Sequence, residues 1–302
     1  MRIRATVAAV TGAVALSAFA GTAAHAVGND SGYRAEVVKL LQAAHNDAGK
    51  RGVKAAPGDG DIVPLDASFS NFKIASSVKV GTTNHVAVTA TYTLTHGADV
   101  DIKSDAFATG PYIYKGSFDE PDNWAFGDLP ATCKAVTDTT ATCTGKIDLY
   151  PGDGELFNSD AGSWKGAALA LNIDESDPEN GDVAMADKGG LGKISVLRNS
   201  RLTTNASPEP VKKGKTLTVT GALTRANWED NKYHGYTKQS VQLQYKKKGA
   251  AGYTTLKTVT SDSKGNLKTT VKASADGYFR YNFAGTSTTP AIASTSDFVD
   301  VK

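Results

Sequence analysis

The chain has 302 residues, of which 40% are hydrophobic, 21% are charged and 8% are aromatic. This length leaves room for about two domains, and this apolar content excludes a chain that is disordered throughout. Two cysteines are too few for a disulfide-dense scaffold. The sequence therefore predicts a globular protein whose organisation is clearer than its chemistry.

The first 26 residues have the three parts of a secretory signal. Arg2 and Arg4 give a positive start, an apolar run follows, and residues 24–26 (Ala-His-Ala) have the small-x-small pattern of a cleavage site. We expect cleavage before Val27; the alternative is an N-terminal anchor helix. No later segment reaches the ~18–20 apolar residues of a transmembrane anchor. The sequence predicts a secreted protein, extracellular or associated with the cell wall.

Charge is divided between two parts of the mature chain. Residues 27–200 carry 15 Lys+Arg and 24 Asp+Glu (15 − 24 = −9), whereas residues 201–302 carry 16 and 7 (16 − 7 = +9). Such asymmetry favours an anionic partner for the second part, or attraction between the two parts. Among partners, an anionic cell-wall polymer or carbohydrate is expected, and a nucleic acid is not.

Residues 27–64 are predicted to form an N-terminal arm. Apolar side chains recur there at helical spacing, at Tyr33, Val37, Leu40, Leu41 and Ala44. Glycines and charged residues at 49–52 end this pattern, and residues 55–61 are typical of a connector. A peripheral helix and a mobile arm both agree with this stretch.

From residue 65 to residue 200 the pattern is that of short strands. Residues 86–94 alternate apolar and polar side chains, which is typical of a half-buried strand. Further strands are predicted at 68–74, 100–102, 112–114, 142–149, 167–173 and 193–197. Many short strands without long helices between them predict an acidic β-sandwich or barrel over residues 65–200.

Residues 201–302 are predicted to form a basic immunoglobulin-like sandwich. Seven strands are expected in about 100 residues, at 201–204, 216–223, 240–245, 253–260, 267–273, 278–284 and 296–301. Tyr278 follows the Asp276-Gly277 turn, where it is either a corner tyrosine bonding back to the chain or a core aromatic. The predicted fold class is therefore all-β, with two immunoglobulin-like sandwiches after the leader and the arm.

This second unit resembles a group of small secreted actinobacterial proteins, through residues 216–228, 239–245, 276–281 and 283–290. The resemblance extends over most of residues 65–302 and leaves out the arm. It implies export, an N-terminal β-unit with one cysteine pair and an immunoglobulin-like C-terminal unit. Members of the group often carry a general calcium-binding description without a defined ligand set.

Cys133 and Cys143 are expected to form a disulfide. An even pair in an exported chain should oxidise, and the short separation suits two adjacent strands. The alternatives are a metal pair or a redox centre, but neither a Cys-x-x-Cys motif nor a nearby histidine supports them.

An acidic stretch at residues 174–187 is the candidate calcium site. Calcium takes six to eight oxygen ligands, which this stretch offers from Asp174, Asp177, Glu179, Asp182 and Asp187. The spacing does not match an EF-hand loop, and the alternative is a solvated acidic loop.

An aromatic stretch at residues 225–238 is the candidate polymer-binding site. It is predicted as a loop at one end of the second sandwich, with cations beside aromatic rings at Arg225, Trp228, Lys232, Tyr233, Tyr236 and Lys238. The alternative is that Trp228 covers the end of the core.

No motif of a nucleophilic, phosphate-binding or zinc-dependent enzyme is present. The main hypothesis is thus a secreted, non-catalytic binding or structural protein of the bacterial cell exterior. Calcium binding through the acidic stretch is the alternative function. A hydrolase acting through two carboxylates about 5–10 Å apart is the third hypothesis.

Overall fold

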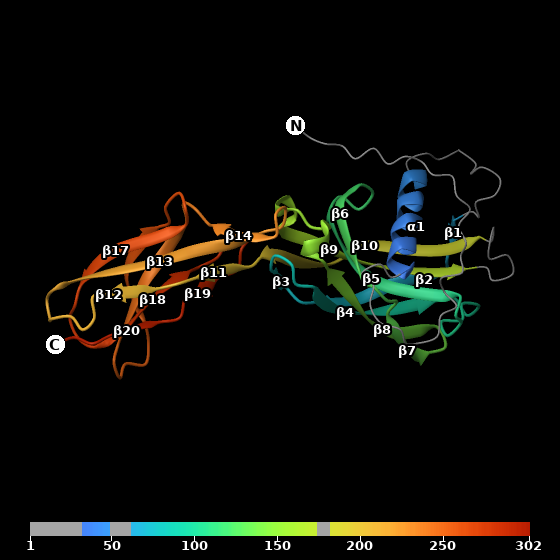
Figure 1. Cartoon of the computed structure of the whole chain (residues 1–302). Coiled ribbons are helices and arrows are strands. Elements are labelled where there is room, and N and C mark those ends of the chain that lie inside the picture. Colours follow the sequence, from blue (N-terminus) through green and yellow to red (C-terminus); the bar gives the residue numbers. More distant parts are fainter. Residues whose placement is uncertain (1–31, 49–61, 174–181) are drawn as a thin grey trace, which may run out of the picture.

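The structure, a computed structural model, describes residues 32–48, 62–173 and 182–302. Two β-sandwiches follow one another along the chain, and helix α1 (Gly32–Ala48) lies on the first (Figure 1). The predicted all-β class with two sandwiches is therefore confirmed. The predicted leader and the predicted connector at 55–61 lie outside the described residues.

The first sandwich has a six-stranded and a four-stranded sheet. The larger sheet runs β1–β10–β9–β5–β6, with β3 also on β10, and its strands are β1 (Ile62–Pro64), β3 (Ser77–Val80), β5 (Phe107–Gly116), β6 (Pro121–Phe126), β9 (Gly162–Ile173) and β10 (Val183–Arg198). The smaller sheet runs β2–β4–β8–β7, with β2 (Ala67–Ile74), β4 (Val86–His96), β8 (Thr140–Leu149) and β7 (Thr132–Thr137). Short 3₁₀ turns at Pro151–Asp153 and Asn158–Asp160 lead into β9.

Strands β5 and β9 are buried on both faces. Ile113 and Ala168 belong to the clusters between the two sheets, whereas Tyr112 and Leu169 pack in the cluster that contains α1. A strand covered on both sides has no polar face, so its sequence lacks alternation. This explains the continuous apolar run at residues 167–171.

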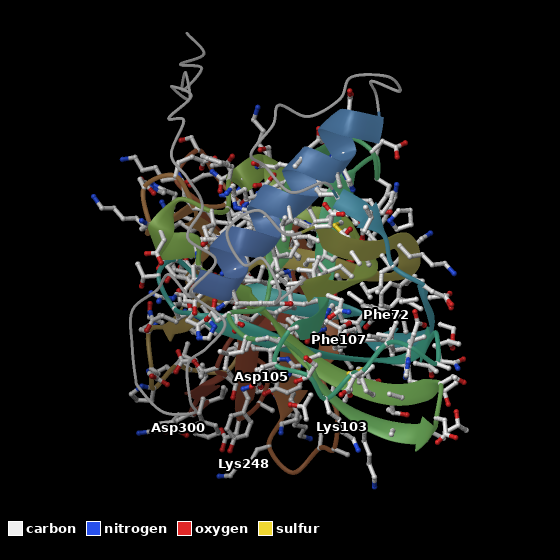
Figure 2. The ribbon with its side chains drawn as sticks, turned by 90° about the vertical axis from the view of Figure 1, so that its right-hand side faces the viewer. Phe72, Lys103, Asp105, Phe107, Lys248 and Asp300 are labelled. Atoms are coloured by element: carbon white, nitrogen blue, oxygen red, sulfur yellow. A yellow bond between two sulfur atoms is a disulfide. The ribbon has the colours of Figure 1, made fainter. Side chains whose placement is uncertain are left out.

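Helix α1 covers the outer face of the larger sheet (Figure 2). Val37 and Leu41 are each 1% exposed and pack against the sheet, so each contributes about 1.5–3 kcal/mol of apolar burial. The helix predicted from apolar spacing is thus present as a docked peripheral element. No helix among the described residues is both long and apolar enough to span a membrane.

The second sandwich has two five-stranded sheets. In one, β13 (Thr216–Asn227) pairs with β11 (Ser200–Leu202), β12 (Asn205–Ser207), β14 (Lys232–Gly235) and β17 (Asn266–Lys272). The other runs β16–β15–β18–β19, with β20 also on β18, and its strands are β15 (Ser240–Lys247), β16 (Thr254–Thr260), β18 (Gly277–Phe283), β19 (Ile292–Ala293) and β20 (Asp297–Val299). Tyr281 lies between them and donates to the Val219 carbonyl at 3.0 Å; burial raises the pKa of Tyr281 to about 12.

Two local predictions differ from the structure. Residues 100–102 form turns instead of a strand, because the Asp101 carboxylate accepts the Lys103 N–H at 2.9 Å and stabilises a turn. The hydroxyl that bonds back near the Asp276-Gly277 turn belongs to Tyr245, which donates to the Ala275 carbonyl at 2.8 Å. Tyr278 instead packs against Phe298.

Cys133 and Cys143 form the expected disulfide between directly opposed positions of β7 and β8. Reduction of the purified protein should lower the free energy of unfolding by about 2–3 kcal/mol, because the unfolded chain regains the entropy of the open loop. Urea unfolding with and without reductant measures this loss. The double variant Cys133→Ala/Cys143→Ala is the control, since its urea unfolding midpoint should not change when reductant is added. An equal response of both proteins would contradict the prediction.

Candidate functional site

Of the five predicted calcium ligands, Asp182 and Asp187 lie in the described part of the chain. Asp174, Asp177 and Glu179 lie outside the described residues, and Asp182 is exposed just before β10. Asp187 lies within β10, and its side chain is only 10% exposed. Calcium binding by the acidic stretch stays a prediction.

Asp187 links the last turn of α1 to the larger sheet through side-chain hydrogen bonds. Its Oδ2 lies 3.1 Å from Nε2 of His45, and its Oδ1 accepts a hydrogen bond from the Tyr112 hydroxyl at 2.7 Å. Burial, together with the Asp187 charge, raises the pKa of Tyr112, so this hydroxyl keeps its proton and remains a donor. The carboxylate therefore has a structural role in docking the helix.

The predicted aromatic loop is a hairpin at the junction of the two sandwiches. Strand β14 pairs back onto β13, and Trp228 follows the end of β13. Trp228 is 2% exposed, packs with Trp164 in the core of the first sandwich, and donates from Nε1 to the Gly81 carbonyl at 2.8 Å. Its assignment to polymer binding is therefore a poor one, because the indole is enclosed at the junction.

The other residues of that stretch divide into paired and exposed groups. Arg225 lies over the ring of Tyr236 with Cζ 3.9 Å from the ring centroid, and Arg201 lies 3.7 Å from the centroid of Tyr233. Burial lowers the pKa of Arg225, which is half-enclosed beside the junction. Both rings are only partly exposed, while Lys232 and Lys238 are exposed. The structure does not arrange these six residues as one open surface.

A more regular surface lies on the outer side of the β16–β15–β18 sheet. Inward positions of β15 and β18 pair Leu243 with Tyr281 in the core, so the alternate positions face outward. Those positions pair Gln242 with Asn282, Gln244 with Arg280 and Lys246 with Tyr278. We call this surface the amide–tyrosine face and define it by Gln242, Gln244, Lys246, Tyr253, Tyr278, Arg280 and Asn282.

Hydrogen bonds hold the polar part of the amide–tyrosine face in place. Nε of Arg280 donates to Oε1 of Gln244 at 2.8 Å, and Nε2 of Gln244 donates to Oε1 of Gln242 at 3.2 Å. Nδ2 of Asn282 also donates to Oε1 of Gln242, at 3.4 Å. A preordered network loses less conformational entropy when a ligand binds.

Aromatic rings and cations make up the rest of the amide–tyrosine face. Cζ of Arg280 lies 3.8 Å from the ring centroid of Tyr253, and Nζ of Lys246 lies 5.2 Å from the centroids of Tyr253 and Tyr278. All seven side chains of the face are partly exposed. Aromatic planes, amides and cations on one rigid sheet suit a ligand that carries hydroxyl groups and negative charge.

Sequence reasoning missed this surface, although part of its signal was readable. Polar residues occupy every second position at 242, 244 and 246, and again at 278, 280 and 282. What the sequence does not reveal is the register that places these two rows side by side. The polymer-binding site was predicted at residues 225–238 instead, because aromatic residues are denser there.

Comparison with known proteins finds distant structural similarities only. No protein family and no curated protein matches the sequence. Among solved structures, the Escherichia coli adhesin FdeC has 12% identity and a TM-score of 0.28, with 83% of this chain and 67% of FdeC covered. The Yersinia pseudotuberculosis adhesin InvE has 11% identity and a TM-score of 0.25, with 76% and 58% covered.

A third structure contains three N-terminal domains of the outer capsid protein Hoc from bacteriophage RB49. It has 11% identity and a TM-score of 0.28, and the match covers 79% of this chain and 71% of that three-domain chain. Values this low carry no argument about activity or partners.

Trp228→Ala should lower the free energy of unfolding by about 3–5 kcal/mol, because it empties a buried position between the sandwiches. Urea unfolding followed by circular dichroism measures the change. Trp228→Phe is the matched variant, since it keeps most of the apolar contact and loses the bond to Gly81. An exposed loop tryptophan would show a change within about 0.5 kcal/mol, and that result would contradict the buried placement.

Proposed function

We propose that this protein is an exported, non-catalytic binding protein of the bacterial cell exterior. Its second sandwich binds an anionic, hydroxyl-rich cell-wall polymer through the amide–tyrosine face. The observation that carries the proposal is the group of amides and cations on β15 and β18 that contact Tyr278 of β18 and Tyr253, the residue before β16. The proposal assigns no reaction to the chain, because the sequence has no nucleophile–base motif.

The charge of the second part supports an anionic ligand. Residues 201–302 have 16 basic and 7 acidic residues, a balance of +9. Lys247, the last residue of β15, and Lys248, which follows the strand, are both exposed. Such a concentration of positive charge attracts polyanions over about one Debye length, ~8 Å at physiological salt. The aromatic rings and amides then provide short-range contacts to the sugar units.

Export is supported by the leader and by the disulfide. The leader has the pattern of a secretory signal, and the cysteines are paired in a bond that persists in oxidising compartments. We expect the mature chain to begin at Val27. Mass spectrometry of the intact protein recovered from the culture medium or the wall fraction measures that end, and a retained leader would contradict this cleavage.

Arg280→Gln should weaken binding to polygalacturonate, a hydroxyl-rich polyanion, about tenfold. The variant loses both the charge and the contact with Tyr253, which together are worth about 1–2 kcal/mol. Tyr253→Ala should weaken binding to a similar degree. Affinity is measured by calorimetric titration over a series of salt concentrations, with neutral dextran as the second probe.

Lys268→Gln is the matched control, because it removes one exposed positive charge from β17, on the opposite sheet. It should change affinity less than twofold. Equal losses in Arg280→Gln and Lys268→Gln would reject the amide–tyrosine face and leave only a general charge effect. Absence of binding to polygalacturonate at low salt would reject the proposed polymer class.

A further inference from the structure

Three metal-ligand side chains meet at one end of the first sandwich. His85 lies just before β4, Asp148 lies near the end of β8, and Asp128 lies in the loop after β6. One ligand atom from each lies within 4.8 Å of the other two. These residues are far apart in the sequence, and the pairing of β4 with β8 brings two of them together.

The orientation of each ligand is set by neighbouring groups. The imidazole of His85 stacks on Tyr150, with ring centroids 4.4 Å apart and an angle of 11° between planes. Oδ2 of Asp148 accepts the backbone N–H of Asp128 at 3.0 Å, and the Tyr150 hydroxyl donates to Oδ2 of Asp128. Outer contacts of this kind fix ligand geometry in metal sites.

A cation already lies against one of these ligands. The guanidinium of Arg34, from the first turn of α1, donates to Oδ1 of Asp128 at 3.3 Å and to Oε2 of Glu155 at 2.5 Å. The Arg34 side chain is 11% exposed, so this charge is held in a largely enclosed place. Asp128 therefore lies where it can bind a positive charge, and in this structure that charge is the Arg34 guanidinium of α1.

We propose that His85, Asp128 and Asp148 form a site for a divalent transition metal of the zinc class, and that Arg34 competes with the metal for Asp128. One imidazole nitrogen and two carboxylate oxygens suit zinc, whereas calcium prefers a full set of oxygens. Nε2 of His85 lies 2.7 Å from Oδ1 of Asp148, so a metal between them replaces that hydrogen bond. Nε2 must then carry no proton, and any proton it shares with Asp148 is released to water.

The site is open on one side. The His85 side chain is 45% exposed and that of Asp148 is 7% exposed. A metal bound here would therefore contact solvent on the His85 side and buried protein atoms on the Asp148 side. Three protein ligands with a remaining position for water is the arrangement of open zinc sites. This site belongs to the first sandwich and is independent of polymer binding by the second.

Calorimetric titration of the purified protein with zinc chloride should give one bound metal, and cobalt chloride should give the visible absorption of a four-coordinate site. His85→Ala should weaken zinc binding at least tenfold and abolish that absorption. Asp148→Asn should have a similar effect; thermal melting without metal shows whether each variant is folded. Arg34→Gln should tighten zinc binding several-fold, because it removes the competing cation.

His234→Ala is the matched control. His234 is exposed and lies 2.6 Å from Oδ2 of Asp230 in the second sandwich, so it forms an imidazole–carboxylate pair like that of His85 and Asp148. This variant should bind zinc as the wild type does. Zinc binding that survives both His85→Ala and Asp148→Asn in folded protein, or no heat at millimolar zinc, would overturn the site. An unchanged affinity in Arg34→Gln would overturn the competition.

Discussion

The β5–β9 strand pair carries large apolar side chains on both faces, and the first sandwich depends on covering both. The four-stranded sheet covers one face, and α1 covers the other. Burial of Val37 and Leu41 contributes more than the largely buried polar contacts at the ends of the helix, because the cost of removing charged groups from water offsets most of their attraction. The apolar stripe therefore provides most of the docking energy.

The polar contacts at the two ends of α1 have a different role. Arg34 meets Asp128 and Glu155 near the start, and His45 meets Asp187 near the end. An enclosed carboxylate without a partner costs several kcal/mol, so a shifted helix would leave Asp187 poorly satisfied. We infer that apolar burial holds the helix on the sheet while these contacts select its position along the strands.

Local patterns in the sequence predicted many of the elements, whereas contacts between distant residues were not predictable. The alternation at 86–94 and the helical spacing from Tyr33 to Ala44 depend only on neighbours along the chain, and both elements are present. Trp228 belongs by sequence to the second unit, yet its indole completes the core of the first. His85 and Asp148 are 63 positions apart, and only the β4–β8 pairing brings them together. The spacing of residues along the sequence does not predict a contact of this kind.

The division of charge along the chain matches the charge of the ligand proposed for each of the two sites. The acidic unit, with a balance of 15 − 24 = −9, contains the proposed cation site, and the basic unit, with 16 − 7 = +9, contains the proposed face for a polyanion. Net charge by itself does not create either site, because salt screens it beyond ~8–10 Å. Specificity comes from short contacts, such as Tyr150 against Asp128 and Tyr253 against Arg280. The overall charge raises the local concentration of a ligand of opposite charge, and the preordered side chains determine which of these ligands binds tightly.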